Sequence, residues 1–125
     1  MAEDNELNIE IATFMLEEAG AEVTVARNGK EAYLTWQNAP IDCYDVILMD
    51  IMMPEMNGIQ AAECIRKSNR QDAGRIPIVA MTANAFAEDI KRCRTAGMND
   101  HLAKPLDIQK LYRTLARYHR SAYSE

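Results

Sequence analysis

The feature that most constrains the fold is a regular alternation of amphipathic and apolar segments along the whole chain. Apolar residues spaced three and four apart predict helices over 5–19, 30–39, 58–68 and 86–96, and a last helix capped by Asp107. Short apolar or alternating segments predict strands over 21–27, 45–50, 76–82 and 101–104. Strands that alternate with helices form a parallel sheet with right-handed crossovers. We therefore predict one α/β domain over residues 1–120, followed by a C-terminal tail over residues 121–125.

Composition narrows the class of protein. The 125 residues are 48% hydrophobic and 26% charged, as in an ordinary globular domain. The formal net charge of −5 argues against a nucleic-acid partner, which calls for a basic surface. No apolar run is long enough to span a membrane, and the acidic start does not resemble a signal peptide. We therefore expect a cytoplasmic protein without membrane contact, whose three cysteines are reduced thiols.

Polar side chains follow the predicted strands at the points where the strands end. Asp50, Thr82 and Lys104 end three of them, and Glu3 and Asp4 directly precede the first helix. The carboxyl ends of parallel strands share one edge of a sheet, where ligands of such folds bind. Carboxylates a few ångströms apart repel by about 4 kcal/mol per pair at an effective dielectric constant of 20. Bound Mg²⁺ would offset this repulsion, so the sequence predicts a magnesium site.

This arrangement suits phosphoryl transfer. The Asp50 carboxylate could attack phosphorus and form an acyl phosphate, while Thr82 and Lys104 bind phosphoryl oxygens. Each residue alone has an ordinary explanation as a turn, strand or loop residue, and only the joint pattern favours the chemistry. A phosphatase of the haloacid dehalogenase type needs a second acid two residues after its nucleophile, where this chain has Met52. A nucleotide-binding fold is also disfavoured, because the chain lacks the glycine pattern that such folds need. Thr24 stands in place of the first P-loop glycine.

Several motifs together resemble a response-regulator receiver domain of two-component phosphorelays, of the type found in hybrid sensor histidine kinases. They are EDNELN at 3–8, LMDIMMPEMNG at 48–58, MTANAF at 81–86 and AGMNDHLAKP at 96–105. The resemblance extends over nearly the whole chain. It implies a flavodoxin-like (βα)5 fold with strand order 2-1-3-4-5.

The resemblance also implies how the site works. Asp50 is expected to accept a phosphoryl group from a phosphohistidine on a histidine kinase or a histidine phosphotransfer protein. Mg²⁺ is expected to be held by Glu3, Asp4, Asp50 and the backbone carbonyl of Met52. Asp4 is the better direct ligand, and Glu3 acts through water.

Two further residues are implied in signalling. Thr82 is expected to move toward the phosphoryl group that Lys104 binds, and His101 occupies the position of the family's aromatic switch residue. A histidine there makes the switch weaker or sensitive to pH. Whether to class such a domain as an enzyme is left open, because it assists its own phosphotransfer and dephosphorylation. It could also be part of a hybrid kinase.

The chain departs from the family in its first strand, which is truncated to Met1 and Ala2 before the acidic pair. The strands beginning at Ala21 and Asp45 should then each lack a partner. Because unpaired apolar edges favour association, we expect a homodimer or higher oligomer, or a sheet whose gap has closed. The alternative function is a receiver-shaped module that binds partners or oligomerises without being phosphorylated.

Overall fold

The computed structural model of the 125-residue chain describes residues 1–53, 56–83 and 87–118. The elements follow in the order α1 (Glu6–Glu18), α2 (Gly29–Asn38), β1 (Ile47–Asp50), α3 (Gly58–Lys67), β2 (Ile78–Thr82), α4 (Ala87–Thr95), β3 (Asp100–Ala103) and α5 (Ile108–Tyr118). From α2 onward the helices and strands alternate as predicted, while the tail predicted at 121–125 lies outside the described residues. None of the described helices is both long and apolar enough to cross a membrane.

The sheet is parallel, with strand order β1-β2-β3. Single β-bridges extend this order, because Ala2 pairs in parallel with Met49 of β1 on one side and with Ala26 on the other. The order across the molecule is thus Ala26, Ala2, β1, β2, β3, which agrees with the predicted order 2-1-3-4-5.

The predicted strand over 21–27 is wrong for most of its length, since only Ala26 forms a bridge. A strand needs backbone groups beside it. In the described part of the chain, Met1–Glu3 supply these next to Ala26: its N–H donates to the Met1 carbonyl, and Glu3 donates to the Ala26 carbonyl, both at 2.9 Å. On the other side, Ala2 donates to Leu48 (2.7 Å) and its carbonyl accepts from Asp50 (3.0 Å). The gap expected at the first strand is therefore occupied by Met1–Glu3.

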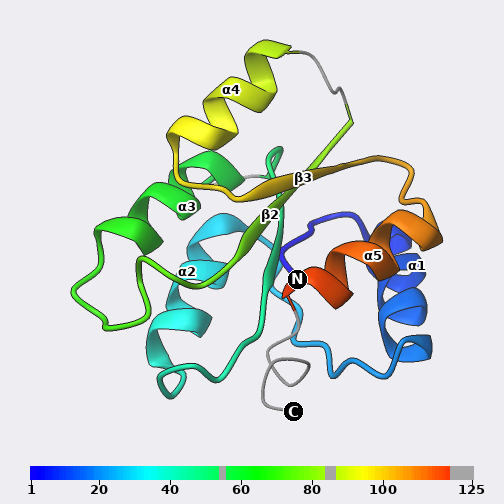
Figure 1. The fold of residues 1–125 in the computed structure, drawn as a ribbon, viewed down its shortest axis with the longest axis horizontal. Helices are drawn as coiled ribbons and strands as arrows, with labels where there is room; N and C mark the ends of the chain where they lie inside the picture. The colour runs from blue at the N-terminus through cyan, green and yellow to red at the C-terminus, as the bar shows by residue number, and fades with distance from the viewer. Residues whose placement is uncertain (54–55, 84–86, 119–125) are drawn as a thin grey trace.

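Helices cover the two faces of the sheet as separate groups. Alternate residues of a strand point to opposite faces, so Ile47 and Met49 pack with Trp36 in one core cluster, and Leu48 packs with Leu16 in the other. In Figure 1, α2, α3 and α4 lie on one side of the strands and α1 and α5 on the other.

Asparagine and aspartate side chains fix where the helices begin. Asn5 caps α1, Asn28 caps α2, and Asn57 forms a capping box with Gln60 at the start of α3. At α5 the Asp107 carboxylate accepts from two backbone N–H groups, as predicted for its cap. Local hydrogen bonds therefore fix where α1, α2, α3 and α5 begin.

Candidate functional site

A lysine and two buried carboxylates form the centre of the site at the carboxyl edge of the sheet. The Lys104 Nζ lies 2.8 Å from Asp50 Oδ2 and 2.7 Å from Glu3 Oε2. Each residue is positioned by the sheet, because Asp50 ends β1, Glu3 donates its N–H to Ala26, and Lys104 donates its N–H to the Thr82 carbonyl at 2.8 Å. The Lys104 ammonium group therefore connects three segments: Met1–Glu3, the end of β1 and the residue that follows β3.

The remaining oxygens of the two carboxylates bind backbone donors. Asp50 Oδ1 accepts from the Met52 N–H at 3.1 Å, and Glu3 Oε1 accepts from the Asn5 N–H at 3.2 Å. The Glu3 and Asp50 residues are only 2% and 4% exposed, so water contributes little to their solvation. Each of the four carboxylate oxygens thus has a donor, which an enclosed ion pair needs if it is to contribute to stability.

Burial and neighbouring charges shift the pKa values of the three groups. The pKa of Asp50 is raised, because burial and the charge of Glu3 outweigh the hydrogen bonds from Lys104 and Met52. Burial also acts to raise the pKa of Glu3, but the hydrogen bonds from Lys104 and Asn5 outweigh it and the pKa is lowered. Burial acts to lower the pKa of Lys104, yet its bonds to Asp50 and Glu3 raise it. Lys104 is therefore charged at neutral pH.

The residues present fit a magnesium ion. Glu3, Asp4 and Asp50 each offer a carboxylate oxygen, and these oxygens lie within 4.8 Å of one another. Asp4 is exposed, so the cluster is open to solvent on one side. A set of carboxylate oxygens without histidine or thiolate is typical of Mg²⁺ rather than Zn²⁺. Met52, the fourth expected ligand, lies two residues after Asp50 and donates its N–H to the Asp50 carboxylate.

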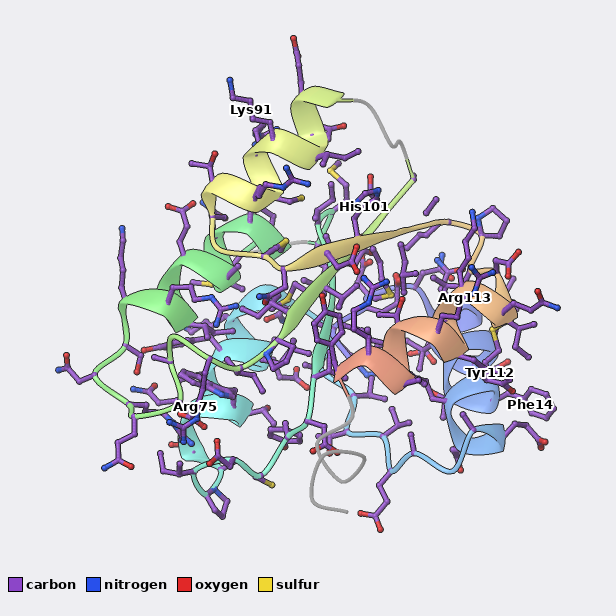
Figure 2. The ribbon with its side chains drawn as sticks, in the orientation of Figure 1. Phe14, Arg75, Lys91, His101, Tyr112 and Arg113 are labelled. Atoms are coloured by element: carbon purple, nitrogen blue, oxygen red, sulfur yellow. The ribbon has the colours of Figure 1, made fainter. Side chains whose placement is uncertain are left out.

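The two expected switch residues lie at different places. Thr82 is buried at the end of β2, one residue beyond the partner of Asp50 in the register. His101 is half-buried on β3 and lines a cavity of about 70 Å³ together with Ile90 and Arg94 of α4. Figure 2 shows His101 on the side of β3 where α4 lies. The structure therefore brings Glu3, Asp4, Asp50 and Lys104 together, with Thr82 at the same edge and His101 further back.

Sequence reasoning did not identify Gly58 as part of the site. A Cβ atom there would collide with the backbone carbonyl of Asp50 and with the Met49 side chain. The absence of a side chain thus lets α3 begin directly against the end of β1. In the sequence Gly58 is predicted only as the first residue of a helix and as the last residue of the LMDIMMPEMNG motif.

We expect Gly58→Ala to lower the free energy of unfolding by about 2 kcal/mol, because either α3 or the Asp50 backbone must shift. Urea unfolding followed by circular dichroism would measure the loss. Gly74→Ala is the matched control, since a Cβ at Gly74 would have no heavy atom within 4 Å. Equal unfolding midpoints for the two variants would contradict the close approach at Gly58.

The chain is similar in sequence to a known protein family and to its members. Residues 1–116 match the response regulator receiver domain. A hybrid signal transduction histidine kinase of Dictyostelium discoideum is 35% identical over 94% of the chain. The chain spans only 7–15% of the length of such curated relatives.

Two solved structures are similar over most of their length. The receiver domain of a sensor histidine kinase from Pseudomonas aeruginosa, with a magnesium ion in its active site cleft, is 38% identical with a TM-score of 0.83, and the match covers 94% of this chain and 92% of that one. The receiver domain of Ssk1 from Saccharomyces cerevisiae, solved with the histidine phosphotransfer protein Ypd1, is 30% identical with a TM-score of 0.82, covering 94% and 84% of the two chains. The predicted flavodoxin-like fold is confirmed by these likenesses.

Proposed function

The chain belongs to the response regulator receiver family of two-component signalling, and we propose that Asp50 accepts a phosphoryl group from phosphohistidine in a Mg²⁺-dependent reaction. The observation that carries this proposal is the Lys104 ammonium group held between Asp50 and Glu3 beside the exposed carboxylate of Asp4. This arrangement provides a nucleophile, a fixed positive charge and an oxygen-lined cation site in one place.

The proposed step is a substitution at phosphorus. A carboxylate oxygen of Asp50 forms the new P–O bond, the P–N bond to the donor imidazole breaks, and the imidazole nitrogen keeps that electron pair. Lys104 is placed to move from Asp50 to an oxygen of the incoming group, and the Met52 N–H orients the carboxylate. Thr82 supplies a hydroxyl at the same edge. Mg²⁺ bound by Glu3, Asp4, Asp50 and the Met52 carbonyl would neutralise the acidic cluster and the phosphoryl oxygens.

The partner we propose is a histidine kinase or a histidine phosphotransfer protein. The curated relatives are histidine kinases, and one similar receiver was solved with Ypd1. Membership in a larger hybrid kinase and a cytoplasmic location remain predictions. So does a signalling switch at Thr82 and His101.

Self-association also remains a prediction. The prediction rested on unpaired strand edges, and the bridges from Ala2 to Ala26 and to Met49 reduce those edges. Sedimentation equilibrium of the purified chain would test it, and a strictly monomeric protein would contradict it.

Labelling by a small phosphodonor tests the proposed function. Incubation with phosphoramidate and Mg²⁺ is expected to add one phosphoryl mass to the intact chain, and either chelation of Mg²⁺ or Asp50→Asn should abolish the gain. Asp45→Asn is the control, because it removes a carboxylate from the same segment of the chain outside the site. An unlabelled wild-type chain, or an Asp50→Asn variant labelled to the same extent, would contradict the proposal. The non-phosphorylated interaction module would then be the better description.

A further inference from the structure

A single exposed methionine lies beside the phosphoacceptor. All eight methionines of the chain are among the described residues, and Met52 alone is exposed, at 73%. The side chains of Met49, Met81 and Met98 are buried, and those of Met1, Met15, Met53 and Met56 are half-buried. Because oxidation of methionine sulfur requires access from solvent, a dissolved oxidant should reach the Met52 thioether before the others.

The Met52 side chain has no packing role that explains its presence. Met53 and Met56 pack against the core cluster that contains Met49, but Met52 is not part of that cluster. A long apolar side chain that remains in water contributes little to the stability of the fold. Its exposure therefore leaves Met52 free to change chemically without damage to the core.

The backbone of Met52 places this side chain next to Asp50. The Met52 N–H donates to Asp50 Oδ1 at 3.1 Å, and the side chain branches from the atom that follows this nitrogen. An unbranched methionine side chain has several rotatable bonds, so its sulfur can reach the space in front of the Asp50 carboxylate. That space is also where a phosphoryl group on Asp50 would lie.

Oxidation would change what Met52 offers to this space. In the reaction with a peroxide, a sulfur lone pair attacks one peroxide oxygen and the O–O bond breaks. With hydrogen peroxide the second oxygen leaves as water, so the sulfur is oxidised by two electrons and the peroxide is reduced. The thioether sulfur is a weak hydrogen-bond acceptor, whereas the sulfoxide carries a polar oxygen.

We propose that Met52 is a redox-sensitive modification site, and that its conversion to the sulfoxide by a peroxide shortens the lifetime of the acyl phosphate on Asp50. This inference rests on the proposed function, because it needs a phosphoryl group on Asp50. The sulfoxide oxygen accepts a hydrogen bond from a water molecule and holds it beside the phosphorus, which the thioether does not do. Methionine sulfoxide reductases restore the thioether, so the modification is reversible.

The step that the sulfoxide accelerates is hydrolysis of the acyl phosphate. The water oxygen forms a bond to phosphorus, and the P–O bond to Asp50 breaks. The carboxylate keeps that electron pair, and the proton lost by the water passes to solvent. The sulfoxide orients the water and takes no proton itself.

The test measures the loss of the phosphoryl group from the full chain before and after oxidation. Hydrogen peroxide is the oxidant, and dithiothreitol is added afterwards, because it reduces disulfides and sulfenic acids of the three cysteines and leaves methionine sulfoxide in place. Peptide mass mapping locates the added oxygen. Intact mass then follows the decay of the label once phosphoramidate has been removed.

Met52 is expected to gain an oxygen before the other methionines do. The half-life of the phosphorylated chain should then shorten by about fivefold, the effect of one hydrogen bond formed in the transition state. Met52→Leu should have the same half-life with and without peroxide treatment. Met52→Gln, which supplies an amide oxygen at a similar distance from the backbone, should decay without peroxide as the oxidised wild type does.

Met53→Leu is the matched control, because it removes the neighbouring thioether, which packs against the core. This variant should respond to peroxide as the wild type does. Circular dichroism before and after treatment would show that oxidation leaves the fold intact.

Three results would overturn the inference. One is a peptide map in which half-buried methionines gain oxygen as fast as Met52. Another is an unchanged half-life in a chain whose Met52 is fully oxidised, and the third is an equal shortening in Met52→Leu. Each of these leaves the proposed function standing, whereas a reduced chain that phosphoramidate never labels would overturn the proposed function and this inference with it.

Discussion

Lys104→Met is expected to abolish phosphoryl transfer to Asp50 and to lower the free energy of unfolding by about 2–4 kcal/mol without Mg²⁺. The ammonium group contacts two carboxylates that are almost fully buried, and its removal leaves both without a cation. The lower end of this range allows for solvent, because the Lys104 side chain is 19% exposed and water weakens its ion pairs. Mg²⁺ should stabilise the variant more than the wild type, because the acidic cluster then depends on the ion alone.

The pH dependence of stability provides a second readout. The pKa of Glu3 is lowered in the folded protein, so it stabilises the wild type above its unfolded pKa, and that stability is lost as pH falls through the folded pKa. The pKa of Asp50 is raised, so its contribution is lost as pH rises through the folded value. Without Lys104 the pKa values of both carboxylates should be raised by burial, so both contributions should be lost as pH rises. The variant should then lose stability relative to the wild type as pH rises from about 4, the ordinary pKa of a carboxylate, through neutrality.

Thermal unfolding over this pH range, with and without Mg²⁺, would measure both effects. Lys110→Met is the control, because it removes one exposed lysine from α5 and touches neither carboxylate. A Lys104→Met variant with the stability and pH profile of the control would show that the ammonium group does not compensate the buried pair.

Much of this site could be predicted because its residues follow local patterns. Asp50 and Thr82 end buried strands, and apolar runs of this kind are recognised without tertiary information. Helix starts at Asn5 and Asp107 depend on hydrogen bonds within a few residues, so their signals are also local. The common edge of the strands then brings Asp50, Thr82 and Lys104 together in any parallel sheet.

Features that depend on distant partners could not be predicted in the same way. Val23 and Val25 alternate as in a strand, but a strand forms only where another backbone lies alongside, and Met1–Glu3 reach just to Ala26. The role of Gly58 depends on how closely α3 approaches Asp50. His101 lines a cavity together with Ile90 and Arg94, and this placement depends on how α4 lies beside β3.

A second buried ion pair lies at the opposite edge of the sheet. The Arg70 guanidinium binds Asp72 through Nε (3.0 Å) and Nη2 (3.2 Å), and it lies 4.7 Å from the ring centre of Trp36. Its Nη1 donates to three carbonyls at the end of α2, those of Trp36, Gln37 and Ala39. Asp72, only 2% exposed, also accepts from the Asp42 N–H. The Arg70–Asp72 pair thus connects the end of α2, the segment before β1 and the segment before β2.

Arg70→Met is expected to lower the free energy of unfolding by about 3 kcal/mol, because it leaves Asp72 buried without its cation and three carbonyls without their donor. The hydrogen bonds from Arg70 hold the pKa of Asp72 low, so the wild type should lose this stability as pH falls through the folded value, and the variant should not. Urea unfolding at several pH values would measure both. Arg75→Met removes an exposed pair with Asp42 and should lower the free energy of unfolding much less, because water screens that pair.

A double variant separates the ion pair from the packing. Arg70→Met with Asp72→Leu removes the buried charge together with its partner, so it should recover part of the loss seen in Arg70→Met alone. Phosphoramidate labelling of Asp50 should persist in all these variants under conditions where they are folded, because the Arg70 cluster and the acidic cluster occupy opposite edges of the sheet. A double variant no more stable than Arg70→Met would place the stabilisation in the Trp36 contact and the carbonyl bonds. Loss of labelling in folded Arg70→Met would contradict the independence of the two clusters.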